Sequence, residues 1–166
     1  MILQKSSNRN LGAIFRISLT MFFFSASLHG QIADDATRRA AQEDNIREAI
    51  FRYEMKDREG IVFLSINNQD PDDSFMKRFS DVKLTVKKLS AIAPAKKPLQ
   101  RWIYDRETGK QGVALWTGKF RWTSDHGAIV DGGYSCGSLC AERGDFYLAS
   151  KHGRWVVEKF DIKAIS

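Results

Sequence analysis

Apolar residues recur at helical spacing in the segment between about Asp35 and Met55. One face of the expected helix carries Ile46, Ala49, Ile50 and Tyr53. Their separations of three and four residues are those of an amphipathic helix. Asp34 or Asp35 is suited to cap its start, because a carboxylate there accepts bonds from free backbone N–H groups. We expect the helix to end before Gly60, in a left-handed conformation that glycine adopts easily.

The next segments alternate between buried strands and short polar turns. The apolar run 61–66 predicts a buried strand, and Asp70 before Pro71, with Asp73 three residues on, predicts the start of a short helix through Phe79. Alternation over 82–87 predicts a half-exposed strand. The lysines at 87, 88, 96 and 97 indicate either an edge strand protected by charge or a surface for an anionic partner. A further short strand is expected at 101–104.

The second half of the chain has the pattern of an antiparallel meander. We expect a long strand at 112–122, with Ala114, Trp116, Phe120 and Trp122 on one face. A turn at 124–127 leads into a strand at 128–134, where the pair Gly132-Gly133 predicts a bulge or a sharp bend. Helices followed by strands predict the α+β class, with a long N-terminal helix and a short helix packed on a curved, mainly antiparallel sheet.

The final hairpin joins strands at 145–150 and 155–162. If His152-Gly153 is a two-residue loop, Leu148 pairs with Val157 and Tyr147 pairs with Glu158. A longer loop with a left-handed Gly153 shifts this register. The sequence leaves both alternatives open.

The first thirty residues have the organisation of a secretory signal. Lys5, Arg9 and Arg16 precede the apolar run 17–24, which is shorter than the ~20 residues that a bilayer span needs. We therefore predict a signal peptide over 1–30 and a single domain over 31–166, secreted or periplasmic and not held in a membrane after cleavage. An uncleaved membrane anchor is the alternative. Without these three cations the net charge falls from +6 to +3.

The closing hairpin also carries a family resemblance. Phe146-Tyr147-Leu148, then the segment 151–158 and the final Ile165-Ser166, resemble the end of nuclear-transport-factor-2-like domains, which have a cystatin-like α+β fold. The resemblance covers roughly residues 36–166. It implies a bent sheet around a helix with a cavity between them. The region 62–79 departs from the pattern, where more helix is expected. Such folds serve many functions, so the resemblance alone selects none.

Cys136 and Cys140 are the two cysteines of the chain. On a straight strand their Cα atoms would be about 13 Å apart, which is too far for a disulfide. A tight turn at Gly137-Ser138 would bring them together. In an oxidising compartment we favour a disulfide over free buried thiols or a redox-active pair. Because neither a third cysteine nor a nearby histidine completes a zinc site, no metal and no cofactor are expected.

The candidate site residues are carboxylates and aromatics on the predicted helix and strands. The expected cavity lining consists of Tyr53, Trp116, Trp122, Asp131, Tyr134, Tyr147 and Glu158. The competing interpretation places these aromatics in the core and these carboxylates in solvent. His126 and His152 each precede a turn glycine and are interpreted as turn residues, so no catalytic residue is assigned.

These observations predict a non-enzymatic exported domain that binds a small apolar or amphipathic ligand, or a protein partner. The alternative is a cavity enzyme of the isomerase, dehydratase or hydrolase type, with Asp131 or Glu158 as its base. The basic residues are not interleaved with aromatics, so nucleic-acid binding is not expected. A homodimer is expected only by analogy with this architecture.

Overall fold

The computed structural model describes residues 22–95 and 102–166, with side chains from residue 37 onward. The chain divides into two compact units at the Ala40–Ala41 bond, inside its first helix, and the second unit, Ala41–Ser166, contains the sheet and the core. The predicted signal peptide over residues 1–30 lies mostly outside the described residues, as do the lysines at 96 and 97. The signal peptide stays a prediction.

Helix α1 extends over Phe22–Met55. It runs through Asp34 and Asp35, so the prediction that one of them caps its start is wrong. It ends at Met55, the expected last residue. Gly60 has the expected left-handed conformation, with a φ of 83°, but it directly precedes β1 and is not the cap of the helix. Among the described residues, no helix combines the length and the hydrophobicity needed to cross a membrane.

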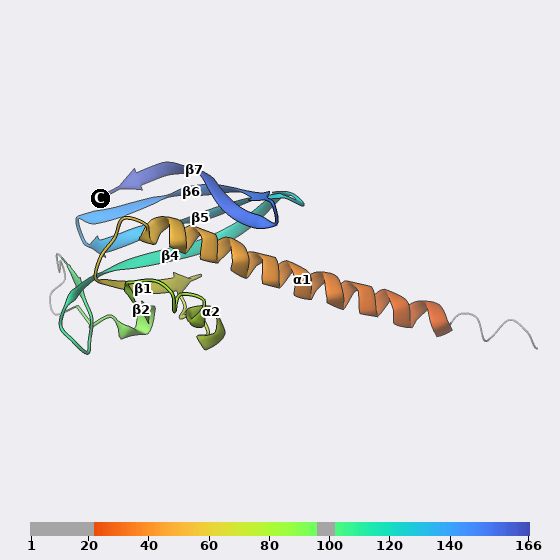
Figure 1. Ribbon diagram of the computed structural model, residues 1–166, viewed down its shortest axis with the longest axis horizontal. Helices are drawn as coiled ribbons and strands as arrows, with labels where there is room; N and C mark the ends of the chain where they lie inside the picture. The colour runs from red at the N-terminus through yellow and green to blue at the C-terminus, as the bar shows by residue number, and fades with distance from the viewer. Residues whose placement is uncertain (1–21, 96–101) are drawn as a thin grey trace, which may run out of the picture. The chain divides into compact units, whose positions relative to one another are not determined.

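The sheet is open and mixed, which confirms the α+β class. Its strands are β1 (Ile61–Ile66), β2 (Thr85–Lys88), β3 (Ile103–Tyr104), β4 (Gln111–Ser124), β5 (Gly127–Gly137), β6 (Cys140–Lys151) and β7 (Arg154–Ile165). Their order is β2-β1-β4-β5-β6-β7, and β3 pairs with β4 (Figure 1). β1 runs parallel to both β2 and β4, whereas β4 to β7 form the predicted antiparallel meander. The strands predicted at 82–87 and 101–104 are shorter than expected.

Short helical turns connect the first strands. Helix α2 covers Asp73–Lys77, and a single 3-10 turn covers Leu89–Ala91. The carboxylate that caps α2 is Asp72, whose oxygen accepts a bond of 2.7 Å from the Phe75 amide. The predicted helix start at Asp70–Asp73 was therefore slightly too early, and the helix ends before Phe79. The other two aspartates have separate partners, because Asp70 accepts a bond from the Ser90 amide and Asp73 pairs with Lys88.

The β6–β7 hairpin has the two-residue loop, which is one of the two alternatives that the sequence left open. Lys151 pairs with Arg154, and the loop residues His152 and Gly153 have φ angles of 52° and 75°. Two positive φ angles are typical of a type I′ turn, which matches the twist of the flanking strands.

Only part of the predicted hairpin register is correct. Leu148 lies opposite Val157 as expected. Tyr147, however, lies opposite Lys159 and not Glu158, because Glu158 is the extra residue of a bulge in β7.

Two hydrophobic clusters join α1 to the sheet. One contains Phe51, Met55, Val62, Leu64, Phe75, Phe79 and Leu115; the other contains Ile46, Ile50, Ala128, Val130, Phe146 and Leu148. The face of α1 that packs on the sheet is therefore rotated relative to the predicted apolar face. Tyr53 is 48% exposed, whereas Phe51, which the pattern did not single out, is fully buried.

Gly132 and Gly133 allow neighbouring strands to approach closely, and the bulge predicted there is wrong. Both residues keep the ladder register with β4 and with β6. A Cβ on Gly132 would lie 2.7 Å from the Trp116 carbonyl oxygen, and one on Gly133 would collide with the Glu142 carbonyl group.

A bulge does occur on the neighbouring strand β4, between Thr117 and Phe120. It reverses which side chains face the helix. Leu115 packs in the core before the bulge, and Phe120 and Trp122 pack there after it. Trp116 therefore lies on the sheet face away from α1, and the prediction that it shares a face with Phe120 and Trp122 is wrong.

A buried ion pair closes the edge of the sheet formed by β2. The Asp105 side chain is fully enclosed and accepts bonds from the Lys87 ammonium group at 2.8 Å and from the amide and hydroxyl of Thr108 at 3.1 and 2.7 Å. Lys87 also pairs with the exposed Glu107, and its neighbour Lys88 with Asp73. The two lysines of this edge strand are thus bound within the domain, consistent with the interpretation as a charged, protected edge.

This ion pair predicts a pH dependence of stability. The hydrogen bond from Lys87, followed by those from Thr108, lowers the pKa of Asp105 from 3.8 to about 2. Because the folded pKa lies below the unfolded one, the ionised form stabilises the native state above pH 3.8, and this contribution is lost as the pH falls toward 2. Urea unfolding should therefore show a smaller loss of stability over this interval in Asp105→Asn than in the wild type. Parallel pH profiles would contradict the prediction.

Candidate functional site

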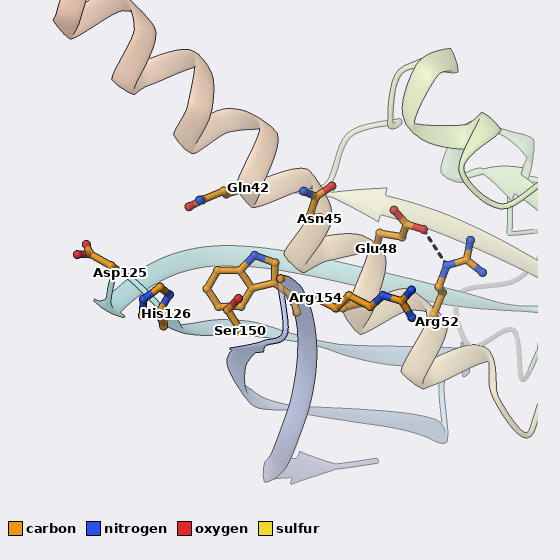
Figure 2. Close-up of a pocket in the computed structure, with 11 residues that line it drawn as sticks. Gln42, Asn45, Glu48, Arg52, Asp125, His126, Ser150 and Arg154 are labelled. Atoms are coloured by element: carbon orange, nitrogen blue, oxygen red, sulfur yellow. Dashed lines mark hydrogen bonds and ion pairs between the residues drawn. The ribbon is translucent and has the colours of Figure 1, made fainter.

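One hollow of the second unit is a groove between α1 and the turns of two hairpins. It has a volume of about 790 Å³. Its lining consists of Gln42, Asn45, Glu48, Ala49, Arg52, Asp125, His126, Ser150, Gly153, Arg154 and Trp155. We call it the hairpin groove. Figure 2 shows Asp125 and His126 at one end, and Glu48 and Arg52 at the other.

The helix side of the groove is held by a network of ion pairs. Arg52 pairs with Glu48 one turn earlier at 2.8 Å and with Asp81 at 3.0 Å. Arg78 binds the other oxygen of Glu48 at 2.9 Å and the side-chain oxygen of Asn45 at 2.8 Å. The hydrogen bonds that Arg52 donates to the Asp81 and Glu48 carboxylates raise the pKa of Arg52. The charges of Glu48 and Arg52 are thus largely compensated within the protein, and they fix this wall.

The hairpin side of the groove is built by packing of tryptophans. Trp155 directly follows Arg154, the first residue of β7, and packs edge-on against Trp122 at a centroid distance of 5.7 Å. Trp155 and Ala49 both pack against the core cluster that contains Ile46 and Ile50. An apolar wall therefore continues from the core into the groove. The type I′ turn fixes the position of Arg154 relative to this wall, because the turn sets the register of the strand.

Three ionisable side chains of the groove have no side-chain partner among the described residues: Asp125, His126 and Arg154. All three are exposed. The backbone around His126 is nevertheless fixed, because its amide donates to the Ser124 hydroxyl at 3.2 Å and its carbonyl accepts a bond of 2.8 Å from the Ser150 amide. In Figure 2 the Arg154 side chain extends along the groove toward Arg52.

This arrangement has the chemistry of a binding site for an amphipathic anion. The guanidinium of Arg154 offers donors in the planar fork that matches a carboxylate. Trp155 offers an aromatic surface beside it. A site with an apolar wall and a few polar groups that fix orientation is the usual form of a small-molecule site.

The residues predicted to line a cavity are distributed over both faces of the sheet. On the helix face, Trp122 packs against Trp155, while Tyr134 lies under the Arg58 guanidinium at 4.1 Å. Burial, aided by a hydrogen bond with Glu142, raises the pKa of Tyr134. Tyr53 contacts the Phe146 ring from α1.

The other four predicted residues have partners elsewhere. Trp116 and Asp131, on the face away from α1, both contact Arg143. Tyr147 lies near the Lys159 ammonium group, at 5.4 Å from its ring centroid. Glu158 pairs with Lys151 at 2.8 Å. None of the seven lines the hairpin groove.

Arg47 is a buried charge of α1 that lies outside the apolar face predicted for this helix. It is 5% exposed and donates to the Thr117 hydroxyl at 2.9 Å and to the Gly118 carbonyl at 3.4 Å. Burial lowers its pKa, and Glu43, at 3.8 Å, opposes that shift. Arg47 therefore joins α1 to the bulge in β4. An arginine one residue after a core isoleucine was the only signal for this role.

Cys136 and Cys140 form the predicted disulfide at the β5–β6 turn, with their Cα atoms 5.3 Å apart. Gly137 is the last residue of β5 and pairs with Cys140, so the turn consists of Ser138 and Leu139, one residue later than predicted. The bridge lies at the opposite end of β6 from Ser150, so it takes no part in the groove. Within the described residues, no three side chains of the types His, Cys, Asp or Glu are grouped as a metal site would require.

Known proteins were compared with the chain by sequence and by structure. No family model, no curated protein and no solved structure matches the chain. The function must therefore be argued from the groove itself.

Proposed function

We propose that this chain is a non-enzymatic binding domain that takes up a small amphipathic carboxylate in the hairpin groove. The observation that carries the proposal is the pairing of Arg154, which has no acidic partner among the described residues, with the apolar wall of Trp155. The carboxylate would accept hydrogen bonds from Arg154, and the apolar body would lie against the indole. Export by the predicted signal at 1–30 belongs to the same proposal.

The other groove charges favour this orientation of the ligand. Arg52 and Glu48 lie side by side on the wall and form an ion pair, so their charges offset each other. The uncompensated positive charge in this part of the groove is therefore that of Arg154. Asp125 would repel a carboxylate placed near the β4–β5 turn. An anionic group is therefore expected at the Arg154 end, with its apolar part directed toward Trp155 and Ala49.

The alternative of a cavity enzyme gains no support from the positions of its two proposed bases. Asp131 is bound by Arg143 on the face away from α1, and Glu158 is paired with Lys151. The resemblance to nuclear-transport-factor-2-like domains stays a prediction. The proposed function does not depend on it, because it rests on groove residues alone.

Decanoate is a suitable probe, since it combines one carboxylate with an apolar chain. Isothermal titration calorimetry should show decanoate binding to the wild type and weaker binding of decan-1-ol, which lacks the charge. Arg154→Gln should weaken decanoate binding about five- to tenfold, as expected for loss of a charged hydrogen bond at an exposed site.

Arg121→Gln is the matched control, because Arg121 is an exposed arginine of β4 outside the groove. It should bind decanoate as the wild type does. Equal losses in the two variants would indicate a nonspecific charge effect and contradict the proposal. Absence of any decanoate binding by the wild type would contradict it as well.

A further inference from the structure

Strand β7 is a long edge strand with nothing paired to its outer side among the described residues. It has 12 residues and is last in the strand order, with β6 as its neighbour. Strands average about 5–6 residues, so this edge is unusually long. An open edge offers a row of backbone N–H and C=O groups with which another strand can pair.

The same strand carries much of the exposed apolar surface. The described residues include five large hydrophobic side chains that are exposed, and three belong to β7: Val156 at 41%, Ile162 at 48% and Ile165 at 70%. A long edge strand with exposed apolar side chains favours association with a further strand.

The charges of β7 indicate which strand it would accept. We propose that β7 pairs antiparallel with β7 of a second copy of this chain, with the two-fold axis at Phe160. In this register Lys159 lies opposite the partner's Asp161, and Asp161 lies opposite the partner's Lys159. Opposite charges directly across an antiparallel pair are stabilising, by roughly 0.2–1 kcal/mol for each pair. A symmetric interface necessarily contains the contact twice.

The neighbouring registers are less favourable. An axis at Lys159 would place two ammonium groups opposite one another, and an axis at Asp161 would do the same with two carboxylates, both of which are destabilising. The axis at Phe160 also lies near the middle of β7, so nearly the whole strand is used. It would place Ile165 opposite the partner's Trp155, which covers the most exposed large hydrophobic side chain of the strand.

The local geometry of β7 permits this pairing at its centre. The bulges relative to β6 occur at Glu158 and Lys163, so residues 159–162 form a regular stretch between them. The three central pairs all fall in this stretch. Phe160 stacks on Phe146 at a centroid distance of 4.2 Å on the helix side of the sheet. The two Phe160 rings would therefore continue one apolar layer from each copy into the other.

Charge reversal tests the register. Sedimentation velocity of the wild type, at loading concentrations up to about 100 µM, should show a monomer–dimer equilibrium. Lys159→Asp and Asp161→Lys should each weaken dimerisation about tenfold, because each places like charges opposite one another twice. The double variant, with both reversals, should recover dimerisation, since the opposite-charge pairs are restored.

Lys119→Asp is the control, because Lys119 is an exposed lysine of β4, in the interior of the sheet order. It should dimerise as the wild type does. Lys159 and Asp161 also pair within the strand at 3.0 Å, so urea unfolding of each variant separates a loss of monomer stability from a loss of association. A wild type that stays monomeric would overturn the proposal, as would a dimer that neither single reversal weakens. A double variant as weak as the single variants would overturn the register.

Discussion

Replacing Gly133 with alanine should destabilise the domain by roughly 3 kcal/mol or more, at the upper end of what overpacking costs. The reason is the close approach of β5 and β6, since the added Cβ would collide with the Glu142 carbonyl group. Backbone atoms in the middle of a sheet cannot move aside as the end of a flexible side chain can. Gly133 also has a φ of 153°, a conformation that alanine adopts only with strain.

Gly109→Ala separates these two contributions. Gly109 has a φ of 67°, but a Cβ there would meet no atom within 4 Å. Its substitution should therefore cost only the conformational penalty, about 1–2 kcal/mol. Urea unfolding followed by far-ultraviolet circular dichroism measures both variants. Equal losses at the two positions would show that the close contact at Gly133 is relieved by movement of the strands.

Phe51→Ala should destabilise the domain by about 3–5 kcal/mol, as is usual for a fully buried phenylalanine. Phe51 is 0% exposed and forms edge-to-face contacts with Phe75 and Phe79, at centroid distances of 6.0 and 6.2 Å. Through Phe75 it packs α1 against α2. Its removal would leave a cavity between these elements, because the surrounding strands are held by their ladders.

Tyr53→Ala is the matched control on the same helix. Tyr53 is 48% exposed and touches the core through one edge-on contact with Phe146. Its loss should cost about 1 kcal/mol or less, as for a surface substitution with one aromatic contact. Thermal or urea unfolding of the two variants should therefore differ clearly. A larger effect at Tyr53 than at Phe51 would contradict the helix orientation described above.

Local signals predicted the features that depend on few residues. The buried strand β1 and the left-handed conformation of Gly60 follow from the preferences of short segments, and both are confirmed. The two-residue turn at His152-Gly153 was one of two alternatives that the sequence left open. The disulfide between Cys136 and Cys140 followed from a distance argument that holds wherever the chain turns.

Features that depend on long-range packing were not predictable in the same way. The buried face of α1 includes Arg47, because β4 places an acceptor hydroxyl and a carbonyl beneath it. Helical spacing of the apolar residues gives no sign of these acceptors. The hairpin groove also escaped prediction. Its walls come from α1, the β4–β5 turn and the β6–β7 turn, which are remote in sequence and individually polar.

Which side chains of β4 and β7 face the helix side of the sheet could be assigned only once the bulges in these strands were known. In β4, alternation continued past the bulge at Thr117 placed Trp116 on the same face as Trp122. In β7, alternation continued past Glu158 gave Tyr147 the wrong partner. A bulge has no strong sequence signature, so period-two patterns are dependable only within an uninterrupted stretch of strand.

The bulge at Glu158 has a consequence for how the groove can vary. A change in the length of the His152-Gly153 turn would shift the register of Arg154 and Trp155. Because β7 already absorbs one extra residue at Glu158, a compensating loss there would leave Phe160 and everything beyond it in place. Such a paired change would shift the short segment 154–157 alone, and it would leave the pairing of Phe160 with Phe146 unchanged.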